Sequence, residues 1–176
     1  YYLMSVDKSL PPHILSPPIH LKRARGYFEL EMFEQADREL RALPDDETWD
    51  KKKKVFQLAI RQECLDWVNM RVLARELRQE FPDEEDWWIS DAYATRRCES
   101  IEKARAVLLD GLAVHYESAM IRYNLACYAC ILGHPGESLD FLKEAVRRDE
   151  KYKKMAFEDE DLKKIQEALR KLGWDK

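Results

Sequence analysis

Residues 123–145, YNLACYACILGHPGESLDFLKEA, contain two apolar segments separated by a short break. The break is Gly133-His134-Pro135-Gly136. Glycine and proline interrupt helices, and proline fits the first turn of a helix because its missing N–H would have no partner there. The stretch therefore predicts one helix that ends at Gly133 and a second helix that begins near Pro135.

The same pattern recurs along the chain with a period of 34 residues. Apolar or small residues stand at Ala36, Met70, Ala104 and Ser138. Five other columns keep the same step: Leu30, Cys64, Cys98 and Leu132; Phe33, Trp67, Ile101 and Pro135; Leu40, Ala74, Leu108 and Leu142; Leu43, Leu77, Gly111 and Ala145; Ala24, Leu58, Ala92 and Ala126. Of these 24 positions 21 are hydrophobic, whereas a step of 33 from the same starting columns gives 14, so 34 is the better period.

Within a unit the apolar spacing is helical. Trp67, Met70, Ala74 and Leu77 recur at intervals of three and four residues, as they do on one face of a helix. Two helices in 34 residues is the period of the tetratricopeptide repeat. A single pair cannot bury its own apolar face, so neighbouring pairs are expected to stack and bury it jointly.

Two units resemble the tetratricopeptide family specifically. Trp88, Ala92, Ala104 and Leu108 are the family's Trp, small residue, second-helix Ala and large apolar residue in order, and residues 124–145 carry another version. Residues 157–162, FEDEDL, resemble the segment that often closes bacterial arrays. The resemblance covers about residues 17–162. It implies an all-α fold, a right-handed α-α superhelix (a TPR solenoid) with a C-terminal capping helix.

The period also predicts the organisation of the chain. We expect an extended Pro-rich leader at 1–16, four units within 17–152 (17–50, 51–84, 85–118 and 119–152), and a capping segment at 153–176. Ser16 is a candidate N-cap for a helix starting at Pro17 or Pro18. In the capping segment, Leu162, Ile165, Leu169 and Leu172 are expected on one apolar face. The chain lacks an initiator Met, which leaves open whether it is a piece of a longer protein.

The first helix of the second unit departs from the family pattern. Lys54, Gln57 and Arg61 stand where the family packs large residues. A register slipped by one would place Val55, Leu58, Ala59 and Gln62 there instead. The sequence leaves this register open.

Charge and composition narrow the classes of function. The net charge of −4 and the pI near 5.7 argue against nucleic-acid binding. The basic run 51–54 follows Asp50 and is interpreted as a solvated helix face. No apolar run approaches the roughly 18 residues of a membrane span, and the N-terminus lacks the order of a signal peptide. Four cysteines in 176 residues do not make a disulfide scaffold, so a cytoplasmic location is expected.

Cys127 and Cys130 form a C-x-x-C motif, for which we favour packing or groove lining over thiol chemistry or a metal site. The motif lies within a helix, no second pair completes a zinc site, and Cys behaves as a small hydrophobe. Cys64 and Cys98 share a column with leucines and are interpreted as packing too.

Other catalytic patterns are equally weak. The histidines are His13, His20, His115 and His134, none with the spacing of a zinc protease. The acidic runs 83–86 and 158–161 fall where helices begin, and a helix N-terminus favours negative charge. No Gly-rich phosphate loop is present. The sequence therefore predicts no enzyme, no catalytic residue, no cofactor and no metal.

The family resemblance implies where function lies. In tetratricopeptide proteins the first helices of successive units line a concave groove in which peptides commonly bind. The 34-residue period indicates which positions of each first helix correspond to that groove. The candidate partner-binding residues are Arg25, Phe28, Lys52, Ile89, Tyr93, Arg96, Arg97, Met120, Tyr123, Asn124 and Cys127. Tyrosine and arginine dominate interface energies, and arginine pairs well with carboxylates. We expect a protein or peptide ligand of mixed apolar and acidic character, unless the tyrosines pack between helices and Arg96-Arg97 are a solvated helix end.

Other functions compete with this one. Some family members clamp the C-terminal carboxylate of heat-shock chaperones with Lys and Asn, but only Asn124 matches, so that partner is not expected. A structural role, as a self-assembling homo-oligomer or one segment of a scaffold, is the alternative, motivated by Trp49 and Trp87-Trp88, of which one ring is expected to stay exposed. A chaperone of secreted proteins and a thiol enzyme are weaker alternatives. Nucleic acid and membrane insertion are not expected.

Overall fold

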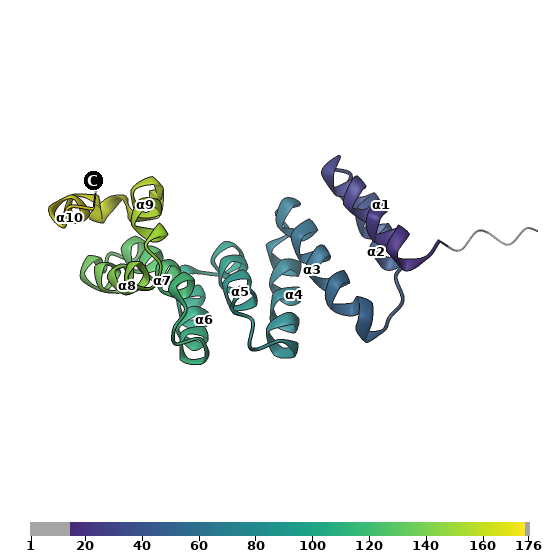
Figure 1. Ribbon diagram of the computed structural model, residues 1–176, viewed down its shortest axis with the longest axis horizontal. Coiled ribbons are helices and arrows are strands. Elements are labelled where there is room, and N and C mark those ends of the chain that lie inside the picture. The colour runs from purple at the N-terminus through teal and green to yellow at the C-terminus, as the bar shows by residue number, and fades with distance from the viewer. Residues whose placement is uncertain (1–14, 175–176) are drawn as a thin grey trace, which may run out of the picture. The chain divides into compact units, whose positions relative to one another are not determined.

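The computed structural model describes residues 15–174, and within them the chain is all-α. The described part contains ten α-helices and one 3₁₀ helix and has no strand; Figure 1 shows the order of the α-helices along the chain. The chain divides into two compact parts, one up to Ile60 and one from Arg61. We call them the N-terminal unit and the C-terminal unit and describe each by itself. The predicted leader at 1–16 lies almost wholly outside the described residues.

The N-terminal unit is built from α1 (Pro17–Glu29), α2 (Phe33–Arg41) and most of α3 (Glu47–Glu63). Ser16 precedes α1 as expected, but its side chain makes no capping hydrogen bond. The buried core consists of Ala24, Ala36, Leu40, Leu43 and Ile60. The ring of Phe28 on α1 meets Phe33 and Phe56 edge-on, with centroids 5.5 and 5.4 Å apart. Aromatic contacts therefore join all three helices of this unit.

Five helices of the C-terminal unit follow the repeat. They are α4 (Trp67–Glu80), α5 (Glu85–Cys98), α6 (Ile101–Val114), α7 (Ala119–Ile131) and α8 (Pro135–Arg148). Each packs against the next in the chain. Asp66, Ser100 and Ser118 cap three of these helices, because each side chain accepts a hydrogen bond from a backbone N–H in the first turn.

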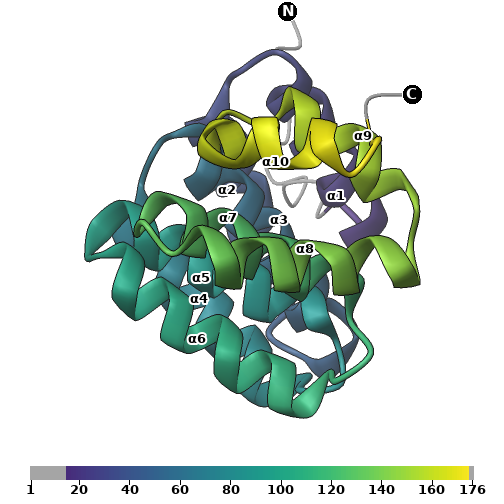
Figure 2. The same ribbon diagram turned by 90° about the vertical axis from the view of Figure 1, so that its left-hand side faces the viewer.

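A short segment closes the C-terminal unit. It consists of α9 (Lys151–Glu158), the 3₁₀ helix η1 (Glu160–Ile165) and α10 (Gln166–Lys171). Figure 2 shows this segment lying against α7 and α8, and η1 contacts both of these helices. Leu162, Ile165 and Leu169 are buried as predicted, whereas Leu172 is 46% exposed and does not belong to that face. The chain turns at Gly173, with φ of 71°, immediately after Leu172.

The 34-residue columns supply about half of the buried hydrophobic residues in the described chain, and their three exceptions have specific contacts. Gly111 lies against Trp88, where a Cβ on the glycine would come within 3.0 Å of the indole ring. Ser138 is buried and donates a 2.8 Å hydrogen bond to the carbonyl of Ala126. Pro135 is the first residue of α8, as the sequence predicted. Each non-hydrophobic residue in the pattern therefore fits its place in the repeat.

Two residues of one column were predicted wrongly. Leu30 is 69% exposed and Cys64 is exposed, although both were expected to pack. Leu30 is the C-cap residue of α1, and Cys64 directly follows the last residue of α3. Side chains at these helix ends project where the chain turns and no neighbouring helix covers them.

Candidate functional site

An apolar hollow of the N-terminal unit lies between α1 and α3, with a volume of about 710 Å³. We call it the α1–α3 groove. It is lined by Leu21, Arg25, Phe28, Glu29, Lys51, Lys52, Val55, Phe56 and Ala59. Three of the predicted partner-binding residues, Arg25, Phe28 and Lys52, lie here together.

Helical spacing brings these side chains to one surface. On α1, Leu21, Arg25 and Phe28 are spaced by four and three residues. On α3, Lys52, Val55 and Ala59 are spaced by three and four residues, so each set lies on one face of its helix. The apolar members form the floor, since Phe28 contacts Phe56 across the two helices. Among the cationic members Arg25 and Lys52 are exposed, as expected for long basic side chains that keep their charge in water.

The groove carries more positive than negative charge. Arg25, Lys51 and Lys52 line it, against the single carboxylate of Glu29. Arg25 is exposed and has no carboxylate within 4 Å among residues 15–174. In the same basic run, Lys53 and Lys54 are paired with Asp45 and Asp50. The interpretation of residues 51–54 as a solvated face therefore holds for only part of the run, because Lys52 is exposed whereas the side chains of Lys53 and Lys54 are only 13% and 17% exposed.

In the C-terminal unit, three predicted site residues are covered by the closing segment. Arg96 binds Asp161 through two hydrogen bonds, Nη1–Oδ2 at 2.5 Å and Nη2–Oδ1 at 3.1 Å. Tyr123 donates its hydroxyl to Asp159 at 2.8 Å. The Cys127 thiol lies 3.4 Å from the same carboxylate. The acidic run 158–161 therefore contacts the first-helix surface of this unit through Asp159 and Asp161, in addition to spanning the start of η1.

Burial sets the protonation of these groups. Removal from water is the first cause that raises the pKa of the Cys127 thiol, and the neighbouring Asp159 carboxylate raises it further. The pKa of Tyr123 is also raised, first by burial and then by its hydrogen bond to Asp159. Burial raises the pKa of Tyr128 to about 12. A protonated thiol is a poor nucleophile and a poor metal ligand, so packing is the role that fits Cys127.

Tyr93 and Arg97 belong to a different cluster on the same unit. The ring of Tyr93 meets that of Trp67 nearly at right angles, with centroids 5.6 Å apart. The Arg97 guanidinium carbon lies 5.1 Å from the Tyr93 ring and 5.5 Å from the Trp67 ring. Trp67 was predicted only as a packing residue, and no sequence signal marked it as a partner of Arg97.

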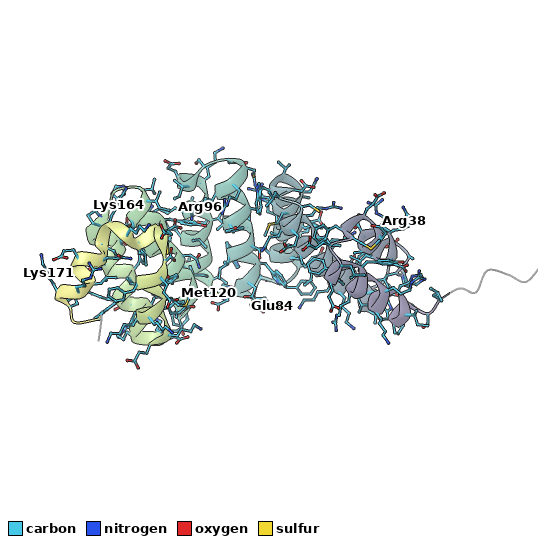
Figure 3. All side chains as sticks on the ribbon, turned by 90° about the horizontal axis from the view of Figure 1, so that it is seen from above. Arg38, Glu84, Arg96, Met120, Lys164 and Lys171 are labelled. Atoms are coloured by element: carbon cyan, nitrogen blue, oxygen red, sulfur yellow. The ribbon has the colours of Figure 1, made fainter. Side chains whose placement is uncertain are left out.

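The remaining predicted residues are held by their own helix or by the core. Asn124 donates to the carbonyl of Met120 at 2.9 Å, one turn back in α7. Ile89 and Met120 pack against the buried cluster of the C-terminal unit. In Figure 3, Arg96 and Met120 lie toward opposite edges of this unit. The predicted residues of the C-terminal unit therefore do not converge on one hollow.

The Trp pair expected to expose one ring is covered on both sides. Trp87 is buried and donates to Glu84 at 3.0 Å. Trp88 is half-buried, with the Arg78 guanidinium 4.5 Å from its ring and Gly111 against it. These rings contact their own chain and do not form an exposed patch.

No group of three or more His, Cys, Asp or Glu side chains in residues 15–174 is placed to hold a metal ion. No helix in the same range is long and apolar enough to cross a membrane.

Similarity to solved structures identifies the class of fold. The chain is a tetratricopeptide-type all-α solenoid. It is similar to TTC0263, a thermophilic TPR protein in Thermus thermophilus, with a TM-score of 0.63 at 14% identity over 90% of this chain and 86% of that one. It is also similar to the solved structure MamA MSR-1 C2, with a TM-score of 0.62 at 13% identity over 81% of this chain and 82% of that one. No protein-family model matches the sequence, and no curated protein matches it significantly.

Proposed function

We propose that the protein is a non-catalytic interaction module whose α1–α3 groove binds a peptide or protein segment of mixed apolar and acidic character. The observation that carries the proposal is Arg25, an exposed arginine with no carboxylate partner in the described chain, standing over an apolar floor. The tetratricopeptide-type fold is consistent with this use, since its first helices commonly line peptide-binding surfaces.

The floor of the groove suits an apolar anchor. Leu21, Phe28, Val55 and Phe56 are only partly buried in the free protein, and the hollow of about 710 Å³ is large enough for one or two side chains. Burying a leucine or phenylalanine contributes roughly 1.5–3 kcal/mol. Binding an apolar side chain there would remove apolar surface from water on both partners.

The cationic residues of the groove favour a ligand with negative charge. Arg25 and Lys52 favour a carboxylate next to the apolar anchor, because charge-assisted hydrogen bonds are about twice as strong as neutral ones. The C-terminal unit contains an example of this recognition within the chain itself. There Asp161 binds Arg96, and Tyr152 stacks on Tyr123 with ring centroids 4.7 Å apart.

A titration with a defined peptide tests the proposal. The probe is acetyl-Glu-Asp-Leu-Phe-Asp-Glu-amide, added to the ¹⁵N-labelled chain, and the amide resonances of Phe28, Val55 and Ala59 are followed. We expect these resonances to shift and the affinity to fall in the double variant Arg25→Gln/Lys52→Gln. The variant Lys154→Gln is the matched control, because Lys154 is also an exposed cation without an ion pair in the described chain.

Two results would contradict the proposal. One is equal binding of a peptide in which lysine replaces each acidic residue. The other is a set of shifts confined to residues outside the groove. Circular dichroism of each variant first establishes that the helix content is unchanged.

A scaffold or self-assembling segment is the second candidate, and an exposed apolar strip on α4 favours it. The strip consists of Val68 and Val72, which are 64% and 50% exposed and lie four residues apart on one face of the helix. Leu65, which is 66% exposed, precedes the N-cap residue Asp66 of this helix. Self-assembly predicts a molar mass by light scattering that rises with concentration and falls in Val68→Glu/Val72→Glu. A constant monomer mass would contradict it.

A further inference from the structure

Arginines in the described chain are almost always paired with a carboxylate within 4 Å. The exceptions within residues 15–174 are Arg25, Arg97 and Arg122. Arg25 lines the α1–α3 groove, and Arg122 donates to the carbonyl of Ser118. Arg97 alone of the three is held by aromatic rings, although it is exposed and next in sequence to the fully paired Arg96.

The aromatic rings fix the position of Arg97 before any ligand binds. Its guanidinium carbon lies 5.1 Å from the Tyr93 centroid and 5.5 Å from the Trp67 centroid, within the range of a cation–π interaction. Its Nη2 donates to the Tyr93 hydroxyl at 3.1 Å. Ordering a long side chain normally weakens binding, and a side chain that is already ordered avoids most of that cost.

The cluster keeps unused hydrogen-bond donors. A guanidinium has five N–H groups, and Arg97 uses one of them on Tyr93. The Tyr93 oxygen accepts that bond, so its own O–H remains able to donate. A planar anion at the outer edge of Arg97 would meet two parallel N–H groups, the arrangement that suits a carboxylate.

The neighbouring arginine supports a carboxylate as the anion. Arg96 stands one residue earlier on α5 and binds the carboxylate of Asp161 with two hydrogen bonds. The chain thus satisfies one arginine of the pair internally and leaves the other open to solvent. An acidic side chain from a partner could form the ion pair with Arg97 that Asp161 forms with Arg96.

We propose that Arg97, Tyr93 and Trp67 form a carboxylate-binding subsite on the C-terminal unit that takes an Asp or Glu side chain of an acidic peptide segment. This inference rests on the proposed peptide-binding function and adds a separate subsite for such a segment on the C-terminal unit, apart from the α1–α3 groove. Arg97 and Tyr93 contact the carboxylate, whereas Trp67 positions the guanidinium.

The experiment uses the same acidic probe peptide and the full chain. The readouts are the Arg97 Nε–H and the Trp67 indole N–H resonances, followed during the titration and assigned from Arg97→Gln and Trp67→Phe. We expect both to shift at peptide concentrations that saturate the chain. A peptide with Gln and Asn in place of Glu and Asp should leave them unmoved.

Variants then measure the contribution of the subsite. Arg97→Gln should weaken binding of the acidic peptide by about tenfold, equivalent to about 1.4 kcal/mol. Arg97→Lys should recover only part of that loss, because lysine lacks the planar pair of donors. Lys154→Gln, which removes the same charge elsewhere, should bind as the unaltered chain does.

The outcomes separate this inference from the proposed function. If Arg97→Gln binds with unchanged affinity while Arg25→Gln/Lys52→Gln does not, the subsite is overturned and the groove stands. If the peptide shifts neither the groove nor the Arg97 resonances, both are overturned. If inorganic phosphate displaces the peptide from Arg97 at concentrations where acetate does not, the assignment to a carboxylate is overturned.

Discussion

Arg96 on α5 and Asp161 on η1 are 65 residues apart in the sequence and form a bidentate ion pair with two hydrogen bonds. Their side chains are 27% and 28% exposed, so the pair is neither fully solvated nor fully buried. The hydrogen bond to Asp161 is the first cause that raises the pKa of the Arg96 guanidinium. The pair joins the closing segment to the helix that carries Tyr93 and Arg97.

Removing this pair is expected to loosen the closing segment. Asp161→Asn and Arg96→Gln should each lower the free energy of unfolding by roughly 1 kcal/mol, because partly exposed charge pairs contribute less than buried ones. Urea unfolding of both single variants and the double variant measures the coupling between the two side chains. The paired surface residues Arg147 and Glu144, both more exposed, serve as the control cycle. Additive effects of the two variants would show that the pair contributes nothing of its own.

The repeat columns predicted about half of the buried hydrophobic residues, because each of these positions depends on its nearest neighbours in the chain. Ala92, Ala104, Leu108 and Leu142 are all fully buried, as the step of 34 indicated. Stacked repeats make mostly local contacts, so a periodic sequence determines most of the packing. The question of register in α3 could not be settled in the same way. Leu58 and Ile60 are buried while Gln62 is exposed, which the slipped register does not account for.

The sequence predicted the surface of the candidate site only where no segment distant in sequence covers the first helices. Arg25, Phe28 and Lys52 lie together because two first helices lie side by side, as the period implies. Tyr123 and Cys127 follow the same rule, yet Asp159 and Tyr152 cover that surface. A contact between segments more than 30 residues apart leaves no signal in the spacing of apolar residues. The acidic run suggested a helix start, and its second role became evident only from the folded arrangement.

Alkaline pH is expected to destabilise the C-terminal unit. The pKa values of Cys127, Tyr123 and Tyr128 are all raised by burial, from ordinary values of 9.0 and 10.0. The folded state therefore holds these protons at a pH where the unfolded state loses them. Their contribution to stability is complete below about pH 9 and declines as the pH rises above it. Urea unfolding at pH 8, 9, 10 and 11 should show this decline, and Tyr128→Phe should make the slope smaller. A free energy of unfolding that stays constant to pH 11 would contradict the burial of these groups.

Thiol reactivity offers a related prediction. Cys64 is exposed, whereas Cys127 and Cys130 are buried. A thiol reagent added to the native chain at pH 8 should modify Cys64 quickly and reach Cys127 and Cys130 only after denaturant is added. Mass spectrometry of the modified peptides identifies each site. Rapid labelling of Cys127 in the native chain would restore the thiol-enzyme hypothesis.

A buried carboxylate between α4 and α5 is expected to be the most sensitive polar residue. Asp91 is fully buried, accepts a hydrogen bond from Thr95 at 3.1 Å, and lies 3.0 Å from Arg78 and 3.4 Å from Arg75. Asp91→Ala leaves two guanidinium groups without their carboxylate. It should lower the free energy of unfolding by about 3 kcal/mol, because removing one member of a buried ion pair leaves the other charge buried and unpaired. Asp86→Ala, at an exposed position five residues earlier, should change stability by less than about 0.5 kcal/mol. Thermal unfolding followed by circular dichroism compares the two.

Leu65 has a backbone conformation that favours glycine. Its φ is +56°, and Gly133, two repeat periods later in the same turn, has φ of +84°. The left-handed region costs an L residue roughly 1–2 kcal/mol, and the Leu65 side chain is 66% exposed, so few contacts repay that cost. Leu65→Gly should therefore raise the free energy of unfolding by about 0.5–1 kcal/mol, after allowing for the extra freedom of glycine in the unfolded chain. Val68→Gly is the matched control, because it removes an exposed side chain from a helical position of α4 and should lower stability by a similar amount. If both substitutions lower stability equally, Leu65 makes contacts that compensate for its backbone strain, and the exposed strip on α4 would then be the first place to look for them.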